Sequence, residues 1–302
     1  MYLEHFRLTD RPFSLTPDTE YYYRSATSQE AFNVVLVALQ QGEGIVKIVG
    51  EVGTGKTVMC RKLLNDLPEA MITVYLPNPL MEPQQLYRAV AEELGLDVAS
   101  DSAVNDLIER LNHHLIALSN DGRQVVVCVD EAQTMPTPTL EALRLLSNVE
   151  TEKRKLLQIV LFGQPELDER LAERSLRQLR QRIGFSYRLQ PLDYPGFVGY
   201  VDHRLRMAGY LGTPLFSPAA LKMLYRAARG VPRLVNILAH KALMAAYGRG
   251  YTYIGSKQVY AAVADTEGVS LSSYRRLMLI ACGALLVGCC FVLGVLINGW
   301  LP

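Results

Sequence analysis

The residues with the clearest chemical capacity lie between an apolar run and a stretch of helical character. Residues 50–57 are Gly-Glu-Val-Gly-Thr-Gly-Lys-Thr, which fits the pattern G-x-x-x-x-G-K-[ST]. In this pattern the glycines let backbone N–H groups curl around phosphate oxygens, and the following helix adds the positive end of its dipole. The sequence therefore predicts a phosphate-binding loop made by Gly50, Glu51, Val52, Gly53, Thr54, Gly55, Lys56, Thr57 and Val58.

Two side chains of this loop indicate which ligand it binds. The ammonium group of Lys56 can reach the β- and γ-phosphates of a nucleotide, and the hydroxyl of Thr57 can bind Mg²⁺. The sequence has no Asn/Thr-Lys-x-Asp motif of the kind that reads guanine. We therefore expect ATP and Mg²⁺ as ligands, with Lys56 also contributing to catalysis.

An acidic pair follows a second apolar run. Residues 125–129 are Val-Val-Val-Cys-Val, and Asp130 and Glu131 come directly after them. Asp130 is expected to bind Mg²⁺, directly or through water, and Glu131 to polarise the attacking water as the catalytic base. Such a pair taken alone can equally be a solvated turn. Next to a phosphate-binding loop it favours hydrolysis over simple nucleotide binding.

Four further polar residues are candidates for the same site. Gln164 ends the next apolar run, where its amide would lie beside the γ-phosphate and orient water; the alternative is an ordinary turn glutamine. Arg177, Arg180 and Arg182 precede the fifth β-rich run. A guanidinium from one subunit can reach a neighbour's γ-phosphate as an arginine finger. The alternative for each arginine is a solvated basic helix face.

A last candidate lies further along the chain. Gly230-Val-Pro-Arg233 begins a predicted helix beyond the final β-rich run. Arg233 can contact the nucleotide across a domain junction and couple nucleotide state to the angle between domains. The alternative is an ordinary surface arginine.

The elements that would position these residues alternate regularly. Four of the five β-rich runs are almost wholly apolar, as in strands covered on both faces, whereas 185–189 is mixed and suits a sheet edge. Strand–helix alternation predicts a mostly parallel, doubly wound α/β sheet, followed after Leu192 by helices alone. Expected strands are 45–49, 72–76, 125–129, 157–162 and 185–189. Expected helices are 28–41, 57–67, 84–94, 104–118, 138–149 with Thr137 as its cap, 197–207, 218–228, 232–247 and 257–264.

Composition is that of a globular protein. Of 302 residues, 49% are apolar and 20% are charged, and the formal charge is +1, so no global positive field for nucleic acid exists and no nucleic-acid partner is expected. The five cysteines lack metal-site spacing, which indicates reduced, structural thiols and a cytosolic location for the soluble part.

A hydrophobic segment lies near the C-terminus. Residues 277–297 carry no charge, and as a helix rising about 1.5 Å per residue they would cross the roughly 30 Å bilayer core. Arg275 and Arg276 precede the segment, so the positive-inside rule places the N-terminal part in the cytoplasm. The alternative is a buried core helix. We expect one transmembrane helix in a single-pass protein.

The order of the motifs resembles that of AAA+ ATPases. A Walker A loop, a Walker B Asp-Glu pair, a sensor-1 amide, a candidate finger and a sensor-2 Gly-x-Pro-Arg follow one another. The resemblance implies an α/β P-loop core with a parallel five-stranded sheet and an all-helical lid. It also implies that Gln164 is sensor 1, Arg233 is sensor 2 and Arg182 is the first choice of finger.

A more specific resemblance is to the ExeA (general secretion pathway protein A) family, over roughly residues 1–265. It rests on Tyr2, Phe6 and Pro12-Phe-Ser-Leu-Thr-Pro-Asp18, on the Walker A loop, on Gly163-Gln-Pro-Glu-Leu, and on Leu176-Arg-Gln-Leu-Arg-Gln-Arg-Ile183. It implies the segments 1–41 (N-terminal family segment), 42–192 (nucleotide-binding domain), 193–267 (lid), 268–276 (linker), 277–297 (transmembrane helix) and 298–302 (short tail).

The short chain is most similar to MshM-type members, which support biogenesis of the mannose-sensitive haemagglutinin (MSHA, type IV) pilus. Cell-wall binding, found in the longer secretion members, is not carried over. The resemblance implies a homo-oligomer in the bacterial inner membrane whose partners are pilus or secretion components. Two alternatives stay open: a DNA-associated AAA+ ATPase of the target-selection or origin-binding type, and a non-hydrolysing nucleotide switch that scaffolds partners.

Overall fold

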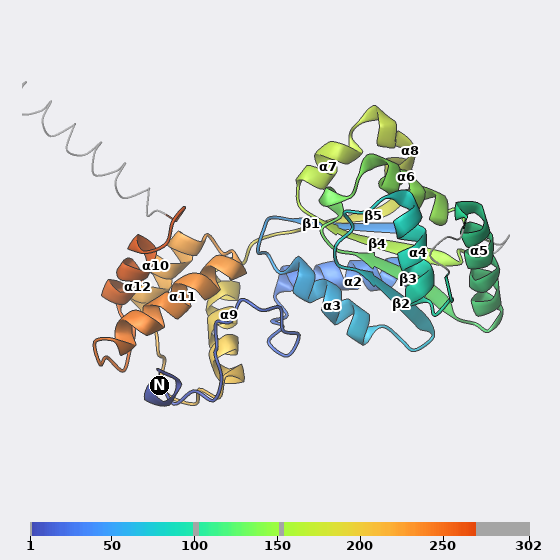
Figure 1. Ribbon diagram of the computed structural model, residues 1–302. Coiled ribbons are helices and arrows are strands. Elements are labelled where there is room, and N and C mark those ends of the chain that lie inside the picture. The colour runs from blue at the N-terminus through green and yellow to red at the C-terminus, as the bar shows by residue number, and fades with distance from the viewer. Residues whose placement is uncertain (1, 99–102, 151–153, 270–302) are drawn as a thin grey trace, which may run out of the picture.

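The computed structural model describes residues 2–98, 103–150 and 154–269, which form an α/β domain beside a helical one (Figure 1). The sheet has five strands in the order β2-β3-β4-β1-β5, and every neighbouring pair is parallel. The predicted parallel five-stranded sheet is therefore confirmed. The strands are β1 (Ile45–Gly50), β2 (Met71–Leu76), β3 (Gln124–Val129), β4 (Leu157–Gly163) and β5 (Ile183–Leu189).

Helices cover both faces of the sheet, which explains the apolar runs. Along β3, Val125 and Val127 enter one core cluster, whereas Val126 and Cys128 enter the cluster on the opposite face. Alternation along a strand sends successive side chains to opposite faces, so a strand buried on both needs apolar residues throughout. The covering helices are α2 (Ala26–Gln40) and α3 (Lys56–Asp66) on one face, and α4 (Pro83–Glu93), α5 (Val104–Asn120) and α6 (Thr137–Leu146) on the other.

Strand β5 lies at the edge of the sheet, as its mixed sequence predicts. Half-buried and exposed residues alternate along it until Leu189, which is buried. Helix α2 packs against β5 and β1, and the Tyr187 hydroxyl donates to Glu30 across this contact at 2.8 Å. An edge strand needs less apolar surface because it has a neighbouring strand, here β1, on one side alone.

Two short helices that are not among the expected helices lie between β4 and β5. They are α7 (Glu166–Leu171) and α8 (Arg177–Arg182), and a 3₁₀ turn precedes α8. The expected cap of α6 was wrong: Pro136 precedes the helix, and Thr137 is its first residue. The Thr137 hydroxyl instead accepts a hydrogen bond from Arg170 on α7.

The helical domain, here called the lid, contains α9 (Tyr194–Met207), α10 (Pro218–Ala228), α11 (Pro232–Tyr247) and α12 (Ser256–Ala264). The start of the chain, including α1 (Tyr2–His5), packs into its core (Figure 1). Phe6, Phe13 and Tyr21 are buried there, and the ring centroids of Phe13 and Phe216 lie 6.1 Å apart. Phe6, Phe13 and Tyr21 are thus packing residues that complete the core of the lid.

The expected transmembrane helix at 277–297 and the tail at 298–302 lie outside the described residues. Within the described ranges, no helix combines the length and the apolar character needed to cross a membrane.

Candidate nucleotide-binding and catalytic site

The phosphate-binding loop joins β1 directly to α3, as its motif predicts. Gly53 and Gly55 have φ of 81° and 102°, a left-handed conformation that glycine adopts without strain. Lys56 is buried, and its Nζ donates to the carbonyl oxygens of Gly50 at 2.8 Å and Glu51 at 3.0 Å. Burial lowers the pKa of Lys56, and the nearby charges of Glu131 and Asp130 act in the opposite direction.

Arg233 at the start of lid helix α11 touches this loop. Its backbone N–H donates to the Gly53 carbonyl at 3.1 Å. A Cβ atom added to Gly53 would lie 2.5 Å from the Cβ of Arg233, so only glycine allows this approach. The structure therefore brings the sequence-predicted Arg233 against the phosphate-binding loop.

The junction between lid and α/β domain depends on a second glycine of the same motif. Gly230 has φ of 74°, and a Cβ atom there would lie 2.0 Å from the Leu192 carbonyl oxygen. The Leu192 N–H donates to the Gly230 carbonyl at 2.9 Å. This close backbone contact fixes the position of Arg233 three residues later.

Replacing Gly53 by Ala is expected to weaken ATP binding about tenfold or more. The methyl group must displace Arg233 from the loop, and a displacement that costs about 1.4 kcal/mol of binding corresponds to tenfold in affinity. The strain of a left-handed alanine is present in the free and the bound protein and is matched in the control. Fluorescence titration with an ATP analogue measures the effect. Gly122→Ala is the matched control, because Gly122 has φ of 77° with nothing within 4 Å of an added Cβ. Equal affinities in both variants would contradict the role of the Gly53–Arg233 contact.

Asp130 and Thr57 form the oxygen-rich corner of the site. Asp130 is buried directly after β3, and its carboxylate accepts the Glu131 backbone N–H at 2.9 Å. Burial raises the pKa of Asp130, and a hydrogen bond from the Thr57 hydroxyl counteracts that rise. Thr57 and Asp130 are thus adjacent, as two ligands of one cation must be.

The donor chemistry of this corner fits Mg²⁺. Mg²⁺ is commonly held by one or two carboxylates together with substrate phosphates and water, and not by a full protein cage. Within the part of the chain that the structure describes, no three His, Cys, Asp or Glu side chains group as metal ligands. Asp130 with the Thr57 hydroxyl is therefore a set suited to Mg²⁺ that arrives with a nucleotide.

Glu131 and Gln164 meet across the ends of β3 and β4. The Gln164 Nε2 donates to Glu131 Oε2 at 2.9 Å. Glu131 itself has φ of 52° and ψ of 38°, an uncommon left-handed conformation for a residue with a side chain. Such backbone strain is often found at functional sites. The structure thus brings together the predicted base and the predicted sensor amide.

Sequence reasoning missed Gln133, which contacts both of these residues. Its side chain donates to Glu131 Oε2 and accepts the Gln164 backbone N–H at 3.0 Å. A polar residue two positions after the Asp-Glu pair was the available signal. Its role became visible only once β3 and β4 lay side by side.

Arg182 lies at the end of the sheet where β1 and β5 begin, opposite the end that carries the phosphate-binding loop. It ends α8 and immediately precedes β5, where Ile183 pairs with Ile45 at the start of β1. Gly50 pairs with Leu189 at the far end, so the two sites are separated by roughly 16 Å, five residues at about 3.3 Å each. The structure therefore does not bring Arg182 to its own phosphate-binding loop, and Arg177 and Arg180 on the same helix are exposed.

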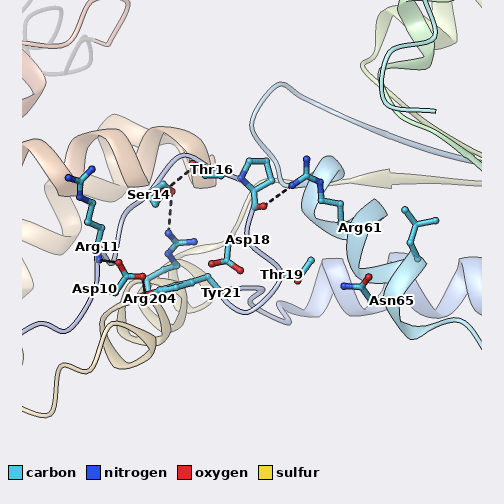
Figure 2. A pocket seen from close by; sticks show the side chains of 12 residues that line it. Asp10, Arg11, Ser14, Thr16, Asp18, Thr19, Tyr21, Arg61, Asn65 and Arg204 are labelled. Atoms are coloured by element: carbon cyan, nitrogen blue, oxygen red, sulfur yellow. Dashed lines mark hydrogen bonds between the residues drawn. The ribbon is translucent and has the colours of Figure 1, made fainter. Parts of the chain in front are cut away.

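A further wall of the site comes from residues 12–18, here called the strap. Arg204 on α9 donates to the carbonyl oxygen of Pro12. It also donates to the carbonyl oxygen of Ser14 at 3.2 Å (Figure 2). Arg61 on α3 donates to the Pro17 carbonyl at 3.0 Å. The strap is therefore fastened to the lid at one end and to the helix of the phosphate-binding loop at the other.

Arg204 is almost fully buried, so its charge needs compensation. The two carbonyl oxygens supply part of it, and the Tyr21 ring lies 4.4 Å from the guanidinium carbon. A cavity of about 450 Å³ lies on this side of the strap, and Asp10, Asp18 and Arg61 are among its lining residues (Figure 2).

A second cavity, of about 410 Å³, is lined by many of the predicted residues, although Asp130 and Gln164 are not among them. It is lined by the phosphate-binding loop from Val52 to Met59, by Glu131, by Arg233 and by the strap with Tyr21, Tyr22 and Tyr23. Loop, acidic residue, lid arginine and N-terminal segment therefore surround one space. Its chemistry, with phosphate donors at one side and aromatic rings at another, suits a nucleotide.

Comparison with known proteins agrees with this geometry. A family profile described as an AAA domain matches residues 39–171. General secretion pathway protein A of Aeromonas hydrophila is 40% identical over 289 residues, which are 95% of this chain and 53% of that protein. The chain belongs to the ExeA family of AAA+ ATPases. This member spans about half the length of the curated relative that it matches.

The fold of this ExeA-family chain also occurs in solved structures of other proteins. Cdc6p of Pyrobaculum aerophilum matches with a TM-score of 0.70 and 17% identity, over 87% of this chain and 73% of that one. Aeropyrum pernix ORC2, with ADPNP and ADP, matches with a TM-score of 0.63 and 17% identity, over 88% of this chain and 73% of that one. The Thermotoga maritima RuvB branch-migration motor matches with a TM-score of 0.54 and 16% identity, over 84% of this chain and 72% of that one. Identities this low establish the fold alone.

Proposed function

We propose that this chain binds ATP with Mg²⁺ and hydrolyses the β–γ phosphate bond. The observation that carries the proposal is the meeting of Lys56, the Thr57–Asp130 pair and Glu131 at one end of the sheet, where Lys56, Thr57 and Glu131 line one cavity. Arg233 reaches the same cavity from the lid. Family membership supports this choice over other uses of a phosphate-binding loop.

Each residue then has a definite task. The loop N–H groups and Lys56 bind the phosphates. Thr57 and Asp130 would hold Mg²⁺, which would supply positive charge to offset the negative charge of the phosphates. Glu131 accepts a hydrogen bond from the attacking water and takes its proton. Gln164, bound to Glu131, orients the same water. Arg233 contacts the loop through Gly53, so we propose that the nucleotide state sets the lid position.

Replacing Lys56 by Ala is expected to abolish ATP turnover, because the loop loses both its phosphate-binding charge and the hydrogen bonds to Gly50 and Glu51. Phosphate release by the full chain in detergent measures this. Lys62→Ala is the control, since Lys62 lies on the same helix and, within the described part of the chain, forms its ion pair with Asp66. Near-normal hydrolysis by the Lys56 variant would overturn the site, and no hydrolysis by the unmodified chain, or equal hydrolysis with EDTA, would overturn the Mg²⁺–ATPase proposal.

We further propose that residues 277–297 anchor the protein in a bacterial inner membrane, with the nucleotide-binding domain (42–192) and lid (193–267) in the cytoplasm. The support is the uncharged length of this segment and the basic pair before it. The ATPase would form a homo-oligomer and act on components of a type IV, MSHA-type pilus or a related secretion machinery. The 40% identical relative is named for general secretion, which supports the broader of these assignments.

The alternative functions receive less support. A DNA-associated role rests on likeness to origin-recognition structures that are 16–21% identical, and such likeness shows fold and not ligand. The net charge of +1 also does not favour it. A non-hydrolysing switch would not need a base and an amide bound to each other as Glu131 and Gln164 are.

A further inference from the structure

The side chain of Gln133 lies between the two residues expected to act on water. Its Nε2 donates to Glu131 Oε2, and its Oε1 accepts the backbone N–H of Gln164 at 3.0 Å. The Gln164 side chain donates to the same Glu131 oxygen at 2.9 Å. Gln133, Glu131 and Gln164 therefore form a closed ring of three hydrogen bonds.

The ring fixes one carboxylate oxygen and leaves the other available. Both amide donors reach Oε2, and among the described residues no hydrogen bond to Oε1 is present. A glutamate side chain has three rotatable bonds, so an unheld carboxylate would sample many positions. Two donors on one oxygen hold the group in place and leave Oε1 as the oxygen that can accept a proton.

Gln133 is itself held from outside the ring. The guanidinium of Arg170 donates to the Gln133 backbone oxygen at 2.6 Å and to the Thr137 hydroxyl at 3.3 Å. Gln133 also belongs to the 3₁₀ turn from Ala132 to Thr134, which directly follows the left-handed Glu131. Helix α7, unexpected from the sequence, thus supports the turn that carries Gln133.

We propose that Gln133 is a positioning residue for ATP hydrolysis. It holds Glu131 through Oε2 so that Oε1 faces water as the base, and it holds Gln164 through its backbone, so that base and water-orienting amide move as one unit. This inference rests on the proposed ATPase function. Displacement of a catalytic group by about 1 Å can cost about 100-fold in rate, so loss of this support is expected to matter.

The test compares two substitutions of Gln133 in the full chain in detergent. Gln133→Met removes the N–H donor at similar length, and Gln133→Glu keeps the shape but places an acceptor against the Glu131 carboxylate. Gln40→Met and Gln40→Glu are matched controls, because Gln40 is exposed at the end of α2, near the opposite edge of the sheet. Single-turnover hydrolysis at saturating Mg²⁺–ATP, the Kd of a non-hydrolysable ATP analogue, and Tm are measured for each.

Both Gln133 variants are expected to hydrolyse ATP about 10- to 100-fold more slowly, with Kd and Tm like those of the controls. In a Glu131→Gln background the same substitutions are expected to cost nothing more, because the base they position is gone. A purely structural role would lower the Tm or the affinity as well, and would add its cost in that background. A lowered Tm or affinity, an added cost in the Glu131→Gln background, or an unchanged rate would overturn the inference about Gln133, provided that the unmodified chain hydrolyses ATP. An inactive unmodified chain would overturn the proposed ATPase function together with this inference.

Discussion

Replacing Glu131 by Gln is expected to slow ATP hydrolysis by about 10²- to 10⁴-fold while ATP binding is retained. Glutamine has nearly the same shape as glutamate, and its amide oxygen can still accept the hydrogen bonds of Gln133 and Gln164 that now reach Oε2. It cannot accept a proton from water. The phosphate contacts of Lys56 and the Thr57–Asp130 corner are untouched, so binding persists. Single-turnover hydrolysis and equilibrium binding of labelled ATP measure the two effects separately.

The control for this experiment is Glu51→Gln. Glu51 is an exposed member of the phosphate-binding loop whose backbone carbonyl accepts from Lys56 and Thr54. The control removes the same charge close to the nucleotide without removing the base. Comparable losses in the two variants would mean that charge, and not proton transfer, explains the effect. Loss of ATP binding in the Glu131 variant would contradict its assignment as the base.

Replacing Arg182 by Ala is expected to lower turnover by about 10³- to 10⁵-fold at saturating ATP, the range known for arginine fingers. Arg182 directly precedes β5, so it lies at the end of the sheet opposite to the phosphate-binding loop of its own subunit. A role in hydrolysis therefore requires a second subunit. Turnover per subunit should accordingly rise with protein concentration in the unmodified chain and stay low in the variant.

Mixing inactive variants gives the sharper form of this test. A Lys56→Ala subunit keeps Arg182, and an Arg182→Ala subunit keeps the phosphate-binding loop, so a mixed oligomer contains some complete sites. Recovery of activity on mixing is expected. Arg177→Ala and Arg180→Ala are the comparison variants. If one of them is inactive alone and regains activity when mixed with the Lys56→Ala subunit, while Arg182→Ala does not, that arginine and not Arg182 is the finger. Activity independent of concentration would remove both the finger and the oligomer from the proposal.

Local sequence was enough to predict the sheet and the phosphate-binding loop. Strands buried on both faces need uninterrupted apolar runs, and the runs that end at Val49 and Val129 are followed directly by the functional loop and the acidic pair. Parallel strands bring their carboxyl ends to one edge, so Lys56, Asp130 and Gln164 had to lie near one another. Backbone connectivity alone carried that information.

Other parts of the site could not be predicted because they depend on contacts between distant segments. Gln133 gains its role from the register of β3 beside β4, and Arg204 gains its role from carbonyl groups of the strap. The local pattern around either residue does not show these contacts, and the position of Gln133 two residues after the Asp-Glu pair was the available signal for that residue. Helices α7 and α8 are only six residues each, too short for a clear apolar repeat.

The packing of the chain's first residues into the lid has a consequence during synthesis. Pro12 and Arg204, which meet in the folded protein, are 192 residues apart in the chain. Phe6, Phe13 and Tyr21 are therefore made long before the helices that bury them, and they stay exposed on the ribosome while the α/β domain forms. Contacts of such large sequence separation form late and expose apolar surface to aggregation. The lid core accordingly forms after the α/β domain, and the nucleotide cavity that the lid closes is completed only at that stage.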